Sequence, residues 1–106
     1  MALRIYGETV AMCRDMAVVV RLIEKRDGDL ARQLRRAASS VALNCQEGAY
    51  SLKGHERARW HTAMGSAAEV RAVLDVALAF GLIASVDAAA LDRLDKIVAT
   101  LFRLTR

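Results

Sequence analysis

Proline is absent from this sequence, and aromatic residues make up only 5% of it. Turns are marked by glycine instead, because Gly28, Gly54 and Gly81 stand near the positions where turns are expected. The intervals between these glycines suit four helices, and the hydrophobic content of 55% is mainly aliphatic. The 106 residues therefore predict one all-α domain, an antiparallel up-down-up-down four-helix bundle that spans residues 1–106.

Long hydrophobic runs are also missing. No stretch approaches the ~18 apolar residues that a membrane-spanning helix needs. The most apolar part of the N-terminal region is interrupted by Arg14, Asp15 and Arg21, and no signal peptide is visible. We therefore expect a cytoplasmic protein that makes no contact with a membrane.

Cysteine is scarce, and its placement favours no metal site. Cys13 and Cys45 each lie on an apolar stripe, and neither has a Cys or His at ligand spacing. His55 and His61 are six residues apart, about 240° around a helix, so they cannot easily share an ion. We expect two buried, reduced thiols, no metal and no other cofactor.

Motifs for catalysis are lacking as well. The sequence has no glycine-rich phosphate loop and no nucleophile elbow. A pairing of Cys45 with a histidine across the hairpin is disfavoured, because a reactive thiol needs a polar, partly exposed site. Asp92 and Asp95 are one helical turn apart among basic residues, which is typical of a solvated charged face. We expect that the protein is not an enzyme.

Apolar residues at steps of three and four predict helices over residues 3–26, 30–50 and 53–81, and a fourth from Ser85 onward. Asp29, Ser51 and Ser85 are the predicted N-caps, and Gly81 is expected to end the third helix in a left-handed conformation. The first helix carries two apolar seams. One seam is Tyr6, Val10, Cys13, Ala17 and Val20, and the other is Ile5, Met12, Met16, Val19 and Ile23. The surplus indicates a broad core face or a subunit interface, and we favour the interface.

The central hairpin, residues 30–69, places small and apolar residues on both of its helices. The two predicted core stripes are Leu30, Leu34, Ala37, Val41, Cys45 and Gly48, then Trp60, Ala63, Ala67, Val70, Leu74, Ala77 and Gly81. Gly65 lies beside the second stripe. Because glycine inside a helix costs ~1 kcal/mol relative to alanine, Gly65 predicts close packing at its position.

Polar residues form a second stripe along the same hairpin. Its members are Gln33, Arg36, Ser40, Asn44, Glu47, Ser66 and Glu69. A turn centred on Ser51 places residues opposite each other when their numbers sum to about 102. Arg36 should then meet Ser66, Gln33 should meet Glu69, and Asn44 and Glu47 should lie near residues 55–57. We predict a polar network between the two helices; the alternative is that these are ordinary exposed polar residues.

The residues of this hairpin match a known family. They read Gln33-x-Arg35-Arg36-Ala37-x-x-Ser40-x-x-x-Asn44-x-x-Glu47-Gly48, followed by Ala63-x-Gly65-Ser66-x-x-Glu69. The pattern resembles the four-helix bundle family of 23S rRNA intervening-sequence proteins, which also includes the accessory proteins of diversity-generating retroelements. The resemblance covers the central third of the chain strongly. It implies an antiparallel four-helix bundle that assembles into a homopentamer, and it suggests association with nucleic acid.

Basic residues are the remaining functional signal. The formal net charge is +4, with 16 basic and 12 acidic residues and a pI near 9.6. The candidate nucleic-acid contacts are Arg32, Arg35, Lys53, Arg57 and Arg59. In a ring of subunits each cluster would be repeated, and phosphate contacts add through counterion release. Three interpretations stay open: a ring that binds RNA or DNA backbone, an oligomeric scaffold that binds another protein without nucleic acid, and a merely solvated surface.

Overall fold

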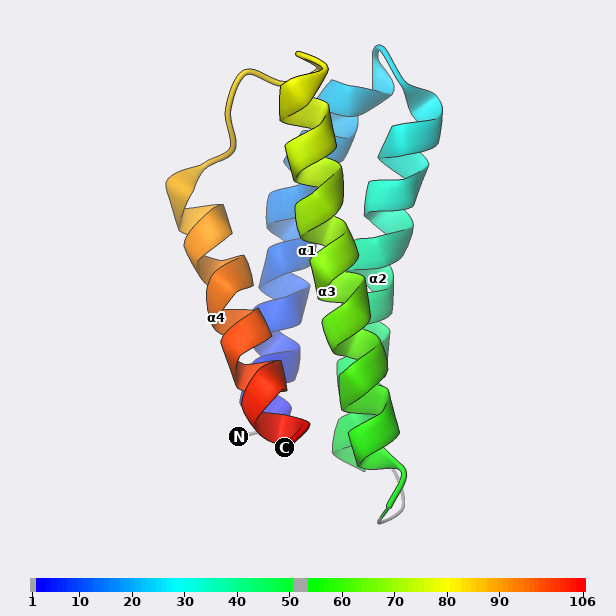
Figure 1. Ribbon diagram of the computed structural model, residues 1–106, viewed down its shortest axis with the longest axis vertical. Helices are drawn as coiled ribbons and strands as arrows, with labels where there is room; N and C mark the ends of the chain where they lie inside the picture. The colour runs from blue at the N-terminus through cyan, green and yellow to red at the C-terminus, as the bar shows by residue number, and fades with distance from the viewer. Residues whose placement is uncertain (1, 51–53) are drawn as a thin grey trace.

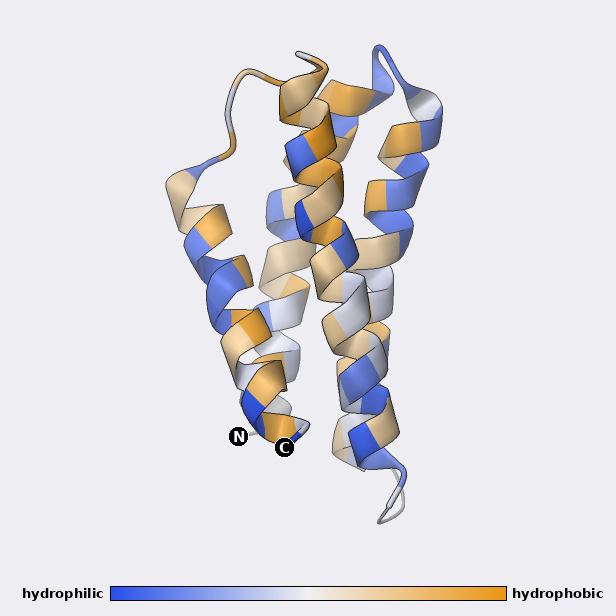
Figure 2. Ribbon diagram, in the orientation of Figure 1, coloured by the Kyte–Doolittle hydropathy of each residue, from blue (hydrophilic) through white to orange (hydrophobic). Residues whose placement is uncertain are grey.

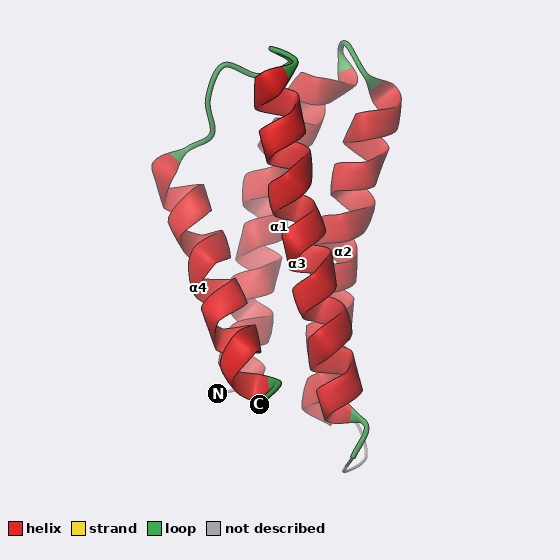
Figure 3. Cartoon of the chain, viewed as in Figure 1, coloured by secondary structure: helices red, strands yellow, loops and turns green. Residues whose placement is uncertain are grey.

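This computed structural model describes residues 2–50 and 54–106, and this part of the chain contains four helices and no strand (Figure 3). The helices are α1 (Ala2–Glu24), α2 (Gly28–Tyr50), α3 (Glu56–Ala79) and α4 (Ala88–Leu104). Side chains are described from residue 4 onward, with the same gap. The predicted all-α four-helix fold is confirmed, although α3 begins three residues later and ends two residues earlier than predicted.

Successive helices run in opposite directions. In Figure 1 the start of α1, the end of α2, the start of α3 and the end of α4 lie at one end of the bundle, and the α1–α2 turn and the α3–α4 connection lie at the other. Packing joins α1 to α2 and α4, and α3 to the same two helices. The bundle measures 43 × 24 × 20 Å. Residues near the start of α2 and residues near the start of α3 therefore lie at opposite ends of the long axis.

The core contains most of the apolar stripes that the sequence predicts, although Leu30 is only partly buried and Gly81 is exposed. Along α1, the buried seam is Ile5, Met12, Met16, Val19 and Ile23, each no more than 7% exposed. The other α1 seam is only partly buried, and Cys13 and Val20 from it pack against the core. Hydrophobic residues recur along all four helices in Figure 2. Among the described residues, no helix is both long enough and apolar enough to cross a membrane.

The end of α3 is built as the sequence predicts. Gly81 has a φ of 70°, in the left-handed region. The N–H of Gly81 donates to the carbonyl of Leu78 at 3.0 Å, and the N–H of Leu82 donates to that of Ala77 at 2.9 Å. This pattern satisfies two carbonyls that the helix end would otherwise leave free. Ile83 is buried, so the chain returns to the core directly after the turn.

Two N-cap predictions were wrong, and the third falls on Ser51, outside the described residues. Asp27, not Asp29, accepts a bond from the N–H of Leu30 at 3.0 Å, and Asp87, not Ser85, accepts one from Ala90 at 3.1 Å. The helices begin at residues 28 and 88, so each aspartate directly precedes its first turn. An N-cap side chain bonds N–H groups two or three residues ahead, which the predicted residues cannot do here.

Removing the N-cap of α4 should destabilise the protein. We expect Asp87→Ala to lower the free energy of unfolding by ~1 kcal/mol, because one N–H of the first turn loses its acceptor. Ser85→Ala, two residues away, should stay within ~0.5 kcal/mol of the wild type. Urea unfolding followed by circular dichroism measures both variants. Equal losses in the two variants would contradict the assignment of the cap.

The close packing expected at Gly65 is absent, and it occurs at Gly48 instead. A Cβ built on Gly65 would have no heavy atom within 4 Å, so this position is open. A Cβ built on Gly48 would lie 2.7–2.9 Å from ring atoms of Trp60, a side chain only 4% exposed. The indole ring of Trp60 on α3 therefore covers Gly48 of α2 and leaves no space there for a side chain.

Candidate functional site

The predicted nucleic-acid contacts do not form one cluster. Arg32 and Arg35 lie in the first turns of α2, whereas Arg57 and Arg59 lie in the first turn of α3, at the opposite end of the bundle. Lys53 is outside the described residues. Because the long axis measures 43 Å, the two groups cannot act as one site within a single copy.

Ion pairing divides these arginines further. Arg32 pairs with Asp29 within the same helix, and Arg59 pairs across helices with Glu47 at 3.2 Å. The Nε of Arg57 donates to the backbone carbonyl of Thr105 at 2.9 Å. Because a carbonyl is neutral, this contact does not neutralise the charge of Arg57. Arg35 is exposed and has no ion pair among the described residues. Arg35 and Arg57 are therefore the predicted contacts best able to attract phosphate.

Three arginines that the sequence reasoning missed lie at the same end as Arg57. They are Arg4 near the start of α1, Arg103 at the end of α4, and Arg106 beyond it. Arg103 donates to the hydroxyl of Thr100 at 3.3 Å, and the guanidinium of Arg106 lies over the Phe102 ring, 4.9 Å from its centre. Neither these three arginines nor Arg57 pairs with a carboxylate among the described residues. We call this group, Arg4, Arg57, Arg103 and Arg106, the basic end.

The basic end could have been found from the sequence. In an up-down bundle, the starts of α1 and α3 share one end with the finish of α4. Cations far apart in the sequence therefore meet there, although each segment alone has only a small excess of charge. The net charge of each stretch of the sequence does not show this grouping. The sum of the charges that lie at one end of the bundle does.

Only some residues of the polar stripe of the central hairpin form hydrogen bonds or ion pairs with one another. Ser40 and Ser66 share a hydrogen bond of 2.7 Å between their hydroxyls. The amide of Asn44 donates to the carbonyl and the hydroxyl of Ser40 at 2.9 and 3.2 Å. Gln33, Arg36 and Glu69 are exposed, and within residues 4–50 and 54–106 neither Arg36 nor Glu69 forms an ion pair. The polar contacts thus concentrate in the middle of the hairpin and at the Glu47–Arg59 pair.

The predicted register of the hairpin was wrong. Ser66 meets Ser40 instead of Arg36, and Glu47 meets Arg59 instead of residues 55–57. In both pairs the residue numbers add up to 106, four more than the assumed sum. The connection is longer than assumed, because α2 ends at Tyr50 as predicted but α3 begins only at Glu56. Each predicted partner therefore moves by about one helical turn.

This register predicts unequal effects of two substitutions in the stripe. Ser66→Ala should lower the free energy of unfolding by ~0.5–1.5 kcal/mol, because Ser40 loses a hydrogen-bond partner in a partly buried place. Glu69→Ala should change it by less than ~0.5 kcal/mol, as at an ordinary surface position. Chemical denaturation measures both. A loss of several kcal/mol on Glu69→Ala would restore the idea of a network that includes this carboxylate.

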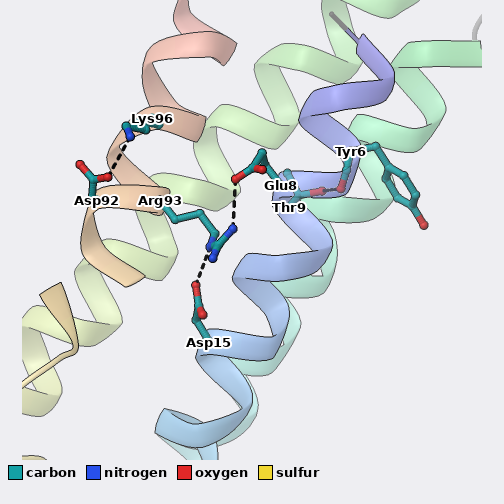
Figure 4. A network of polar contacts seen from close by, with 7 residues as sticks. All are labelled: Tyr6, Glu8, Thr9, Asp15, Asp92, Arg93 and Lys96. Carbon is teal, nitrogen blue, oxygen red and sulfur yellow. Dashed lines mark hydrogen bonds and ion pairs between the residues drawn. The ribbon is translucent and has the colours of Figure 1, made fainter. Parts of the chain in front are cut away.

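Polar contacts also hold α4 against its neighbours. Figure 4 shows Arg93 reaching from α4 to two carboxylates of α1, Asp15 at 2.9 Å and Glu8 at 3.1 Å. The hydrogen bond to Asp15 raises the pKa of the Arg93 guanidinium, so this side chain stays charged.

On the other side of α4, Asp95 pairs with Arg71 of α3 at 2.9 Å. Asp92 pairs with Lys96 on the helix surface at 3.0 Å. These acidic residues act as partners in surface ion pairs.

Groups of ligands for a metal ion do not occur in the described part of the chain, where no three of His, Cys, Asp or Glu come together. His55 and His61 are exposed. Cys45 is fully buried, Cys13 is partly buried, and both are free thiols. Burial raises the pKa of Cys45 to about 12 and also raises that of Cys13. Both thiols therefore stay protonated at neutral pH, which is unlike the thiolate that a metal or a catalytic reaction needs.

Comparison with known proteins adds a family to this geometry. A search of curated proteins and a search of solved structures each returned no match. The model of the 23S rRNA-intervening sequence protein family matches residues 1–103, which cover α1, α2, α3 and all but the last residue of α4, with the central hairpin and its paired motifs. The chain therefore belongs to the family of 23S rRNA intervening-sequence proteins.

Proposed function

We propose that this protein is a non-enzymatic, cytoplasmic bundle protein that self-assembles into a ring-like homo-oligomer, a homopentamer, and binds the phosphate backbone of nucleic acid. The name of the family associates its members with an intervening sequence of 23S rRNA, which supports a role near nucleic acid. The observation that carries the proposal is the basic end. It gathers arginines from three segments of the chain at one end of the bundle, without carboxylate partners among the described residues.

Repetition strengthens such a surface. In a ring whose subunits stand side by side, the basic ends of all copies would form one face. Each unpaired arginine that reaches a phosphate releases counterions, and these contributions add across the ring. Arginine suits this role, since its planar guanidinium can bind phosphate oxygens with two hydrogen bonds. The contact needs no base-specific group, so it would serve duplex RNA and duplex DNA alike.

The test is binding as a function of salt. Fluorescence anisotropy of labelled duplex RNA and DNA should be measured from ~50 to ~200 mM salt, with the particle mass from light scattering in the same buffers. We expect tight binding by a ring-sized particle, with an affinity that falls steeply as salt rises. Each lost phosphate contact should reduce the slope of log affinity against log salt by about 0.9.

Two double variants with the same change of charge locate the surface. Arg103→Gln with Arg106→Gln should weaken binding and flatten the salt dependence, because both residues belong to the basic end. Arg32→Gln with Arg71→Gln removes two arginines that are already paired with carboxylates, so it should change affinity little. Equal losses in both variants would show that net charge, not the basic end, controls binding.

No binding of the wild type at the lowest salt would overturn the nucleic-acid part of the proposal. A ring that forms but binds neither duplex would instead favour the alternative function, an oligomeric scaffold whose partner is another protein.

A further inference from the structure

We propose that copies of this chain join by seating the outer face of α3 from one copy in the groove between α1 and α2 of the next. The inference rests on the self-assembly proposed above and names the two surfaces that make it. These surfaces differ from the basic end, so assembly and nucleic-acid binding use separate parts of the molecule.

The receiving surface is a groove of about 360 Å³ between α1 and α2. Its apolar lining includes Cys13, Ala17 and Val20, which belong to the partly buried α1 seam. Arg21 from α1 and Arg35 from α2 also line it, with Glu24 as the single acidic residue. Neither arginine has an ion pair among the described residues, so the groove joins an apolar surface to uncompensated positive charge.

The entering surface is the solvent side of α3. Glu69, Ala72, Val76 and Phe80 follow one another at steps of three and four, so they share one face of the helix. All four are exposed, with Val76 at 40% and Phe80 at 76%. Glu69 has no ion pair among the described residues. This face is therefore apolar and acidic, the complement of a groove that is apolar and basic.

Charge and shape together favour a second copy as the occupant. A nucleic acid would use the two arginines but would gain nothing from the apolar lining, since its backbone is polar. A helix with an apolar face and a carboxylate uses both features, and the chain itself supplies such a helix. The groove and the face of α3 are different surfaces, so the contact is heterologous. Heterologous contacts close into rings when the rotation between subunits permits closure.

A charge exchange tests this pairing. Arg21→Glu with Arg35→Glu should abolish assembly, and Glu69→Arg alone should do the same, because each places like charges across the interface. The triple variant that carries all three changes should assemble again, since attraction is restored with the signs exchanged. Arg103→Glu with Arg106→Glu is the matched control, with the same change of charge on the basic end, and it should keep the assembled mass.

Light scattering over a range of protein concentrations measures the mass, and so the oligomeric state, of each of these variants. The assembled wild type should have about five times the mass of the broken variants, which should be monomers. Circular dichroism of every variant checks that the helices are intact. If the wild type is a monomer at every concentration, the proposed self-assembly is wrong. If it assembles and both charge-reversed variants still assemble, the proposed interface is wrong while self-assembly stands.

A steric variant gives an independent answer. Gly65 is four residues before Glu69 on the same side of α3, and a side chain there would have open space within one copy. Gly65→Leu should therefore keep or raise the melting temperature of the monomer, because glycine disfavours helix. In the assembly the added side chain should prevent α3 from seating, so the mass should fall about fivefold. An assembled Gly65→Leu protein would overturn the proposed contact.

Discussion

Gly48→Ala should lower the free energy of unfolding by about 1–3 kcal/mol, whereas Gly65→Ala should raise it by about 0.5–1 kcal/mol. Both glycines lie inside helices, and in both cases alanine improves the helix propensity. The difference lies in the neighbours. A methyl group on Gly48 would lie within 3 Å of the Trp60 ring, while a methyl group on Gly65 has no heavy atom of its own chain within 4 Å. The buried indole is rigid, so the clash at Gly48 should outweigh the gain in propensity.

Urea unfolding measures both variants, and a double-mutant cycle with Trp60→Leu tests the mechanism. Trp60→Leu alone should destabilise the core by leaving a cavity. Combined with Gly48→Ala, it should cost less than the sum of the two single changes, because the smaller side chain makes room for the methyl group. Additive effects, or a stabilising Gly48→Ala, would contradict the close approach of α2 to α3 at this point.

Cys45 should be nearly inert towards thiol reagents in the native protein. Burial raises its pKa from 9.0 to about 12, which lowers the thiolate fraction at pH 8 by about a thousandfold. The side chain is also inaccessible, with no exposed surface. In the Cys13→Ser variant, labelling at pH 8 should therefore occur only when the protein unfolds. Labelling as fast as that of a free thiol would contradict the burial of Cys45.

The same shift predicts how stability depends on pH. The native pKa of Cys45 lies above the unfolded value, so the native state holds its proton after the unfolded state has lost it. The contribution of the thiol is fully present below pH 9 and is lost as pH rises towards about 12. Over that range, wild-type stability should fall more steeply than that of Cys45→Ala, by about 1.4 kcal/mol per pH unit. Parallel curves would contradict the shift.

Local information in the sequence determined the helices, their buried stripes and the family. The apolar residues of α1 and α3 recur at helical spacing, and that spacing fixes which side of each helix leaves water. Gly81 could be assigned to the end of α3, because a left-handed residue favours glycine wherever it occurs. The motifs of the hairpin were sufficient for the family for a similar reason, since they depend only on the order of residues along the chain.

Tertiary structure alone decided which residues meet. The register of Ser40 with Ser66 depends on the length of the α2–α3 connection, and a difference of a few residues there moves every partner by about one turn. The choice of Gly48 over Gly65 as the packed glycine depends on the Trp60 ring of the neighbouring helix. The basic end exists because an antiparallel bundle brings Arg4, Arg57 and Arg106 to one end. Helical periodicity is a local property and can be read from spacing, whereas contacts across helices depend on turn length and direction, which no spacing within one helix specifies.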